Sequence, residues 1–99
     1  MEKFRLPYLE VAEDERAVRY LGYRLPLTVG EYEVFKAVFY QRGFIDKKKI
    51  MEIASSDAKL SEKSIAVHIS SINKKALAQG GSKLIGFKKN CGYFVMEDV

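Results

Sequence analysis

The sequence has little of the chemistry that enzymes, metal sites and disulfide-linked domains need. Its 99 residues include one cysteine, Cys91, one histidine, His68, and no tryptophan. A single cysteine excludes an internal disulfide and a cysteine-based metal site, and it fits a reducing cytosol. One histidine without clustered carboxylates leaves no nucleophile–base pair and no metal-ligand set. We therefore expect a cytoplasmic protein that is not an enzyme and uses no metal or cofactor.

Long hydrophobic runs are missing as well. No run approaches the roughly 18 residues that a membrane helix requires, and the acidic, proline-containing N-terminus does not resemble a signal peptide. The composition, 47% hydrophobic and 30% charged, is ordinary for a globular domain, and 99 residues are enough for one core. We expect a single domain over residues 1–99 with no membrane contact.

Positive charge is concentrated in one part of the chain. Residues 1–35 hold five Lys/Arg and seven Asp/Glu, a net charge of −2, whereas residues 36–99 hold twelve and six, a net charge of +6. Such a concentration favours a polyanionic partner, because neutralising phosphates releases condensed counterions. It is equally compatible with a charge that only maintains solubility, so the charge count leaves both interpretations open.

Three segments with different patterns divide the chain. Residues 1–27 read as short strands, with a polar turn at 12–15 and Gly22 between the last two strands. Residues 28–79 carry helical periodicity. Residues 83–87 and 92–96 read as a hairpin whose basic turn is Lys88-Lys89-Asn90-Cys91, in which Asn90 can adopt the left-handed conformation and Cys91 is expected to be a half-buried strand residue. The fold class is α+β, a winged helix-turn-helix with an N-terminal antiparallel sheet, three helices and a C-terminal wing over residues 83–96.

Capping residues mark the start of each predicted helix. Thr28 and Glu31 form a capping box for the first helix, Asp46 caps the second, and Ser61 caps the third. Gly43 ends the first helix, and Gly80-Gly81 ends the third. The residues expected to face the core are Val34, Phe35, Val38 and Phe39 in the first helix, and Ile50, Ile53 and Ala54 in the second.

The helix predicted over residues 61–79 has two unlike faces. At about 100° per residue, one narrow stripe holds Ile65, Ile69, Ile72 and Ala76. The opposite side holds Lys63, Val67, Ser70, Ser71 and Lys74. A solvated helix face normally carries long charged residues, whereas this one carries small residues between lysines. Such a face can bring its backbone close to a polyanion, and it suits a nucleic-acid groove.

Three motifs in this order resemble the OmpR/PhoB-type winged-helix effector domain of bacterial response regulators. Leu27-Thr28 with Glu31 is similar to the family's Leu-Thr-x-x-Glu at the start of helix one. Residues 63–70, Lys-Ser-Ile-Ala-Val-His-Ile-Ser, are similar to its recognition segment Arg-Thr-Val-Asp-Val-His-Ile-Ser. Residues 89–93, Lys-Asn-Cys-Gly-Tyr, are similar to its Arg-Gly-x-Gly-Tyr wing. The likeness covers nearly the whole chain, to Val95.

The resemblance implies a transcription regulator of a two-component system. Members of this family bind double-stranded promoter DNA, often as tandem dimers on direct repeats, with the third helix (here 61–79) in the major groove and the wing (here 87–91) at the minor groove. They also contact RNA polymerase through the loop between helices two and three, which corresponds to Ser55, Ser56, Asp57, Ala58 and Lys59. The family's phosphorylated receiver domain has no counterpart in this sequence, so a separated effector domain and a stand-alone regulator both stay open.

The candidate DNA-binding residues lie on the third helix and the wing. They are Lys63, Ser64, Val67, His68, Ser70, Ser71, Asn73, Lys74, Lys88, Lys89 and Tyr93. Lysines and Ser64 would hold phosphates, Val67 would contact a thymine methyl group, and Ser70 and Ser71 could donate to bases or phosphates. His68 contacts either a phosphate or, as a half-buried histidine, a backbone carbonyl. Tyr93 binds a phosphate or packs in the core.

This chain also departs from the family pattern. Ser71 and Asn73 occupy positions where the family usually has arginines, and Lys63 replaces its leading arginine. Lysine lacks the bidentate fork with which arginine reads guanine. We therefore hypothesise that affinity depends mainly on phosphates and that base discrimination is weak or relies on A·T-rich shape. The alternative is a winged helix that binds protein and has a degenerate DNA face.

Overall fold

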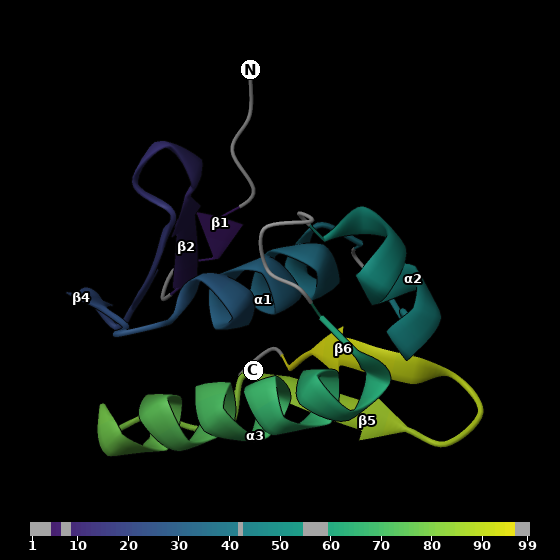
Figure 1. The fold of residues 1–99 in the computed structure, drawn as a ribbon. Coiled ribbons are helices and arrows are strands. Elements are labelled where there is room, and N and C mark those ends of the chain that lie inside the picture. Colours follow the sequence, from purple (N-terminus) through teal and green to yellow (C-terminus); the bar gives the residue numbers. More distant parts are fainter. Residues whose placement is uncertain (1–4, 7–8, 42, 55–59, 97–99) are drawn as a thin grey trace.

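The computed structural model describes residues 5–6, 9–41, 43–54 and 60–96. The strands are β1 (Arg5–Leu6), β2 (Leu9–Ala12), β3 (Ala17–Tyr20), β4 (Tyr23–Arg24), β5 (Ile85–Lys88) and β6 (Gly92–Val95). The helices are the 3-10 helix η1 (Glu13–Glu15) and the α-helices α1 (Val29–Gln41), α2 (Lys47–Ile53) and α3 (Glu62–Ala78). This order is the predicted α+β winged helix-turn-helix, and the fold class is confirmed (Figure 1).

The N-terminal strands form one antiparallel sheet in the order β1-β2-β3-β4. Its central pair is in register from Leu9 opposite Tyr20 to Ala12 opposite Ala17. The expected polar turn at 12–15 is η1, whose C-terminal cap Arg16 adopts φ 50°. Before this turn, the strand region predicted within residues 1–27 contains two strands, β1 and β2.

The three helices begin where their capping residues predict. The Glu31 carboxylate accepts a hydrogen bond from Thr28 N–H at 3.0 Å, and Thr28 Oγ1 accepts one from Glu31 N–H at 3.2 Å. Asp46 Oδ1 accepts from Lys49 N–H at 2.8 Å, and Ser61 Oγ accepts from Ser64 N–H at 3.2 Å. These bonds satisfy N–H groups that a helix start would otherwise leave unpaired.

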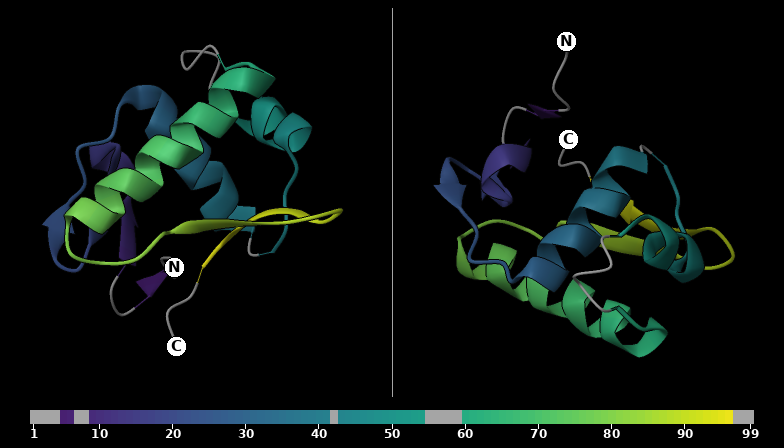
Figure 2. Two further views of the ribbon diagram at one scale, coloured as in Figure 1. Left: turned by 90° about the horizontal axis from the view of Figure 1, so that it is seen from below. Right: turned by 45° about the horizontal axis from the view of Figure 1, so that its top comes forward.

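The core is built around α1. Its four predicted residues Val34, Phe35, Val38 and Phe39 are buried, and so are the four stripe residues of α3, Ile65, Ile69, Ile72 and Ala76. In both views α1 lies between the four-stranded sheet and α3 (Figures 1 and 2). The prediction for α2 is partly wrong, because Ile50 is fully buried but Ile53 is 48% exposed. With only seven residues, α2 packs on the core mainly through Ile50.

The wing is a hairpin that pairs with the segment before α2. Ile45 pairs with Tyr93 of β6 through reciprocal backbone hydrogen bonds of 2.9 and 2.8 Å. The segment at Ile45 therefore extends the two-stranded sheet on the β6 side. Asn90 has φ 68° and so takes the predicted left-handed conformation. The prediction for Cys91 is wrong: it lies in the turn and is exposed, because β6 begins one residue later.

Candidate nucleic-acid interface

The outward face of α3 is made of small and basic side chains. Lys63, Val67, Ser70 and Lys74 are exposed, while the isoleucine stripe on the opposite side is buried. Val67 is 66% exposed although it lies in the middle of a 17-residue helix. A single exposed apolar side chain is ordinary on a protein surface, so Val67 gains meaning only from its place between the lysines of this face. The sequence between Lys63 and Lys74 contains no acidic residue.

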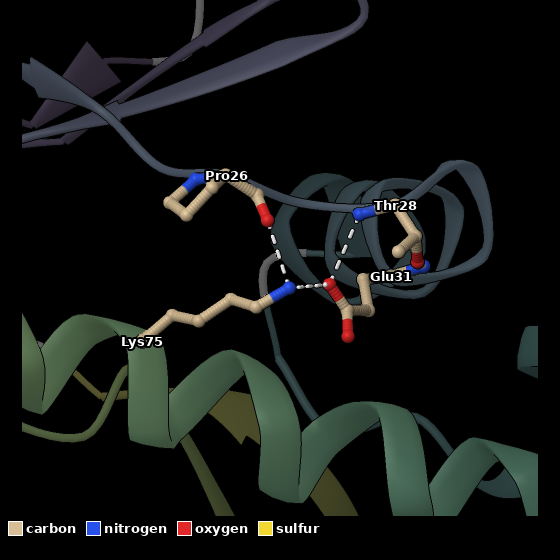
Figure 3. Close-up of polar contacts among 4 residues, drawn as sticks. All are labelled: Pro26, Thr28, Glu31 and Lys75. Carbon is tan, nitrogen blue, oxygen red and sulfur yellow. Dashed lines mark hydrogen bonds and ion pairs between the residues drawn. The ribbon is translucent and has the colours of Figure 1, made fainter.

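A partly buried ion pair joins α3 to the start of α1. Lys75 Nζ donates to Glu31 Oε1 at 2.5 Å and to the Pro26 carbonyl oxygen at 2.8 Å (Figure 3). The same Glu31 oxygen accepts the capping bond from Thr28 N–H. Lys75 therefore ties α3 both to the first turn of α1 and to the segment that leads into it. The pair was not among the predicted site residues.

The environment of Glu31 keeps its carboxylate charged. Burial alone would raise the pKa of Glu31, since the residue is only 5% exposed. Hydrogen bonds from Lys75, Ser71 and Thr28, together with the positive charge of Lys75, outweigh burial and hold the pKa of Glu31 below its usual value. The charged pair thus fixes the orientation of α3 against the core.

His68 packs on the first turn of α1. A Cβ atom added at Gly30 would lie 2.8 Å from His68 Nε2, closer than two such atoms can approach. Any larger residue at position 30 would require the His68 ring to shift. His68 is half-buried, as one of its two alternatives requires, and its predicted phosphate contact stays a prediction.

Two serines of the predicted set already have partners inside the protein. Ser64 Oγ accepts from Ser61 N–H at 2.8 Å and donates to the Ser61 carbonyl oxygen at 2.9 Å. Ser71 is half-buried and hydrogen-bonds to the Glu31 carboxylate. A phosphate could take either hydroxyl only by displacing these bonds. Among the small polar residues of α3, Ser70 is left as the exposed candidate.

Asn73 of the predicted set has partners in the wing. Its Oδ1 accepts from the backbone N–H groups of Leu84 and Ile85, both at 2.9 Å, and its Nδ2 donates to the Ile85 carbonyl oxygen at 3.0 Å. The side chain is therefore turned toward the wing and uses both ends of its amide there. Asn73 positions the wing beside α3, and its predicted DNA contact stays a prediction.

The basic residues of the wing lie at its tip and on its outer side. Lys88 and Lys89 are exposed, and Lys88 Nζ lies 5.9 Å from the ring centroid of Phe44. Tyr93 is half-buried and packs against the core, so the packing alternative describes it best.

The predicted polymerase-contact residues 55–59 lie outside the described residues. Among the residues that the structure does describe, no group of three or more His, Cys, Asp or Glu side chains could hold a metal ion. Within that same part, no helix has the length and hydrophobicity to cross a bilayer.

Sequence reasoning missed the contact of Lys75 with α1 and the contact of Asn73 with the wing, because both residues lie beside the core stripe. On a helical wheel Lys75 falls about 90° from the centre of that stripe on one side, and Asn73 falls about 70° from it on the other. A long side chain at such an edge can reach a neighbouring element, and the buried capping Glu31 is its natural counterion. The signal was present in the pattern, but the choice of neighbour depends on the tertiary structure.

No family model and no curated protein matches the chain. Solved structures, in contrast, do match the chain. The DNA-binding domain of the response regulator AdeR, in complex with an intercistronic region, matches with a TM-score of 0.77 at 22% identity, covering 97% of this chain and 100% of that one. The Klebsiella pneumoniae RstA DNA-binding domain, in complex with the RstA box, matches with a TM-score of 0.71 at 18% identity, covering 96% and 97%.

The chain has the fold of a response-regulator DNA-binding domain. At this level the resemblance to OmpR/PhoB-type effector domains is confirmed. A streptococcal redox sensor, described as evolved from two-component response regulators, also matches with a TM-score of 0.79 at 16% identity. This chain covers 44% of that protein, so its fold corresponds to less than half of the larger molecule.

Proposed function

We propose that this chain binds double-stranded DNA as the effector domain of a transcription regulator. The observation that carries the proposal is the outward face of α3, where Lys63, Val67, Ser70 and Lys74 are exposed on a helix whose other side is buried. Lysines at both ends of the face would hold phosphates, and Val67 and Ser70 would meet base edges in the major groove. The AdeR and RstA domains, which share the fold, were solved bound to DNA.

The wing supplies the second contact of this proposal. Lys88 and Lys89 flank a tight turn, and both are exposed. A basic hairpin tip of this kind would reach the minor groove or its phosphates. Asn73 holds β5 next to α3, so the two contacts are placed relative to each other by three hydrogen bonds.

The chemistry of this face favours affinity over base discrimination. Its cations are lysines, which bind phosphates as point charges and lack the planar fork of arginine. We therefore propose sequence preference that depends on Val67, Ser70 and A·T-rich shape. Binding as tandem dimers, contact with RNA polymerase and a place in the cytoplasm belong to the same proposal and rest on the fold alone.

A salt series of binding measurements tests the proposal. Duplexes selected from a random pool would be compared with scrambled duplexes, for the wild type and for Lys63→Ala, Lys74→Ala and Lys89→Ala. Removing all three lysines should reduce the slope of log affinity against log salt by about three. Lys49→Ala is the matched control, because it removes one exposed lysine whose Nζ lies 3.7 Å from Glu52 Oε1.

Two results would contradict the proposal in different ways. Unchanged affinity and unchanged salt dependence in the triple variant would indicate a protein-binding winged helix. A ratio above about 10⁴ between selected and scrambled duplexes would contradict weak discrimination while leaving DNA binding intact.

A further inference from the structure

The two faces of the wing carry different chemistry. Phe87 pairs with Tyr93 and Lys88 pairs with Gly92 in the antiparallel register. Because side chains alternate along a strand, Phe87 and Tyr93 share one face and Lys88 lies on the other, where it stands over the Phe44 ring. Lys88 therefore points away from the face that carries the aromatic pair.

The aromatic face of the wing borders a notch shared with the start of α2. The notch is lined by Asp46, Lys47, Lys48, Phe87, Gly92 and Tyr93, and its exposed lining is mostly apolar. Gly92 allows the wing to approach this closely: it has φ 119°, and a Cβ atom there would lie 2.5 Å from the Ile45 carbonyl oxygen. The notch is thus a fixed consequence of how the wing pairs with the segment before α2.

Phe87 of β5 is largely exposed although it lines the notch. It is 61% exposed, yet its ring is held by Tyr93, with the ring centroids 5.0 Å apart and the planes tilted by 55°. A phenylalanine that is ordered by a neighbour and still open to solvent offers a flat apolar surface to a partner.

The charge at the mouth of the notch is positive. Lys47 and Lys48 line it, and neither has an ion pair among the described residues, whereas the neighbouring Lys49 lies close to Glu52. Asp46 is the one acidic residue of the lining, and its Oδ1 accepts the capping bond from Lys49 N–H. The two free cations beside an apolar ring match a sugar-phosphate chain, in which charged oxygens alternate with apolar sugar faces.

The position of the notch agrees with this occupant. Seen from below Figure 1, α2 lies between the N-terminal part of α3 and the wing (Figure 2, left). DNA that receives α3 in its major groove and the wing tip in the next minor groove must pass one strand of its backbone between them. The notch is lined by residues from α2 and from the wing, the elements beside that path.

We infer that the notch between α2 and the wing seats the backbone of one DNA strand, with Lys47 and Lys48 on phosphates and the Phe87 ring against a deoxyribose. The inference rests on the proposed function and adds three residues that are not among the candidate DNA-binding residues listed from the sequence. It also predicts that the two kinds of contact respond differently to salt, because lysine–phosphate contacts release counterions and a ring–sugar contact does not.

Binding of a generic duplex of about two helical turns, measured between low and moderate salt, tests the inference. Lys47→Ala and Lys48→Ala should each weaken binding about 3- to 10-fold at low salt and reduce the salt slope by about one. Lys49→Ala should change affinity less than about twofold, although it removes the same charge from the same helix. Phe87→Ala should weaken binding about 3- to 10-fold with the slope unchanged, and Phe87→Leu should restore most of the loss.

Circular dichroism of each variant establishes that it is folded before binding is compared. If Lys47→Ala and Lys48→Ala behave like Lys49→Ala while Lys63→Ala and Lys74→Ala lose affinity, the notch is not a DNA seat and the proposed function stands. If none of the five variants at Lys47, Lys48, Lys49, Lys63 and Lys74 changes affinity, both the proposed function and this inference are wrong. A salt slope for Phe87→Ala that is clearly smaller than the slope of the wild type would also contradict the sugar contact.

Discussion

Lys75 of α3 and Glu31 of α1 form a 2.5 Å ion pair at the boundary between the core and the proposed DNA-binding helix. Glu31 serves two elements at once, since its carboxylate also caps α1 through Thr28 N–H. The adjacent Lys74 is exposed on the outward face. Two neighbouring lysines of one helix therefore have separable roles, one in positioning the helix and one in its proposed contact with phosphates.

Substitution of these two lysines should separate stability from binding. Lys75→Met should lower the free energy of unfolding by about 1–3 kcal/mol, because it leaves the buried Glu31 carboxylate without its charged hydrogen-bond donor. Lys74→Met should leave stability within about 0.5 kcal/mol and weaken DNA binding. Urea denaturation and duplex binding of both variants provide the measurement. Equal stability of the two variants would contradict the role given to Lys75.

The depressed pKa of Glu31 makes part of the stability depend on pH. Because the folded-state pKa lies below the ordinary value of 4.5, the carboxylate stabilises the fold fully above that pH, and the contribution is lost as pH falls through the folded value. Glu31→Gln lacks this contribution at every pH. The stability difference between wild type and Glu31→Gln should therefore be largest near neutral pH and shrink below about pH 4.

Thermal or urea unfolding at several pH values between about 7 and 3 measures this difference. Glu33→Gln is a useful control, because Glu33 is also buried in α1 but its ion pair with Lys36 is longer, at 3.8 Å. A constant difference between wild type and Glu31→Gln across the whole range would show that the carboxylate charge contributes nothing.

Asn73 should behave as a structural residue and not as a DNA contact. Asn73→Ala removes three hydrogen bonds to the backbone of Leu84 and Ile85 and should destabilise the fold by about 1–3 kcal/mol. Amide hydrogen exchange at Leu84 and Ile85 should accelerate, since both N–H groups lose their acceptor. Ser70→Ala, on the exposed face of the same helix, should leave exchange at these amides unchanged. If Asn73→Ala loses only DNA affinity, the original interpretation of Asn73 is right.

The sequence predicted those features that depend on neighbours in the chain. The capping pairs of Thr28 and Ser61, the buried isoleucines of α3 and the left-handed Asn90 follow from local chemistry and helical period. Ile53 and Cys91 were misassigned because their exposure depends on where a short element ends. Periodicity gives the angle of a side chain on a helix, but it does not say which element lies opposite.

The candidate site divides in the same way. Lys63, Val67, Ser70 and Lys74 point outward as the helical period predicts. The partners of Asn73 lie 11 and 12 residues further along the chain, and the Lys75 bond to Glu31 spans 44 residues. Both contacts arise from how the wing and α1 pack around α3, which no local pattern specifies. The notch at Phe87 likewise exists only because the wing pairs with Ile45.

Gly92 should be among the least replaceable residues of the wing. Its φ of 119° is strained for any other residue, and an added Cβ would lie 2.5 Å from the Ile45 carbonyl oxygen and 3.2 Å from Asp46 N. Gly92→Ala should therefore cost about 1–3 kcal/mol and loosen the pairing of the wing with the segment before α2. Gly43→Ala is the matched control, because a Cβ there would meet no atom within 4 Å. Chemical denaturation of the two variants gives the cost, and exchange of the Ile45 and Tyr93 amides reports the pairing. Similar stability of both variants, with both amides still protected, would mean that the wing tolerates a wider approach and that the notch is not held by Gly92.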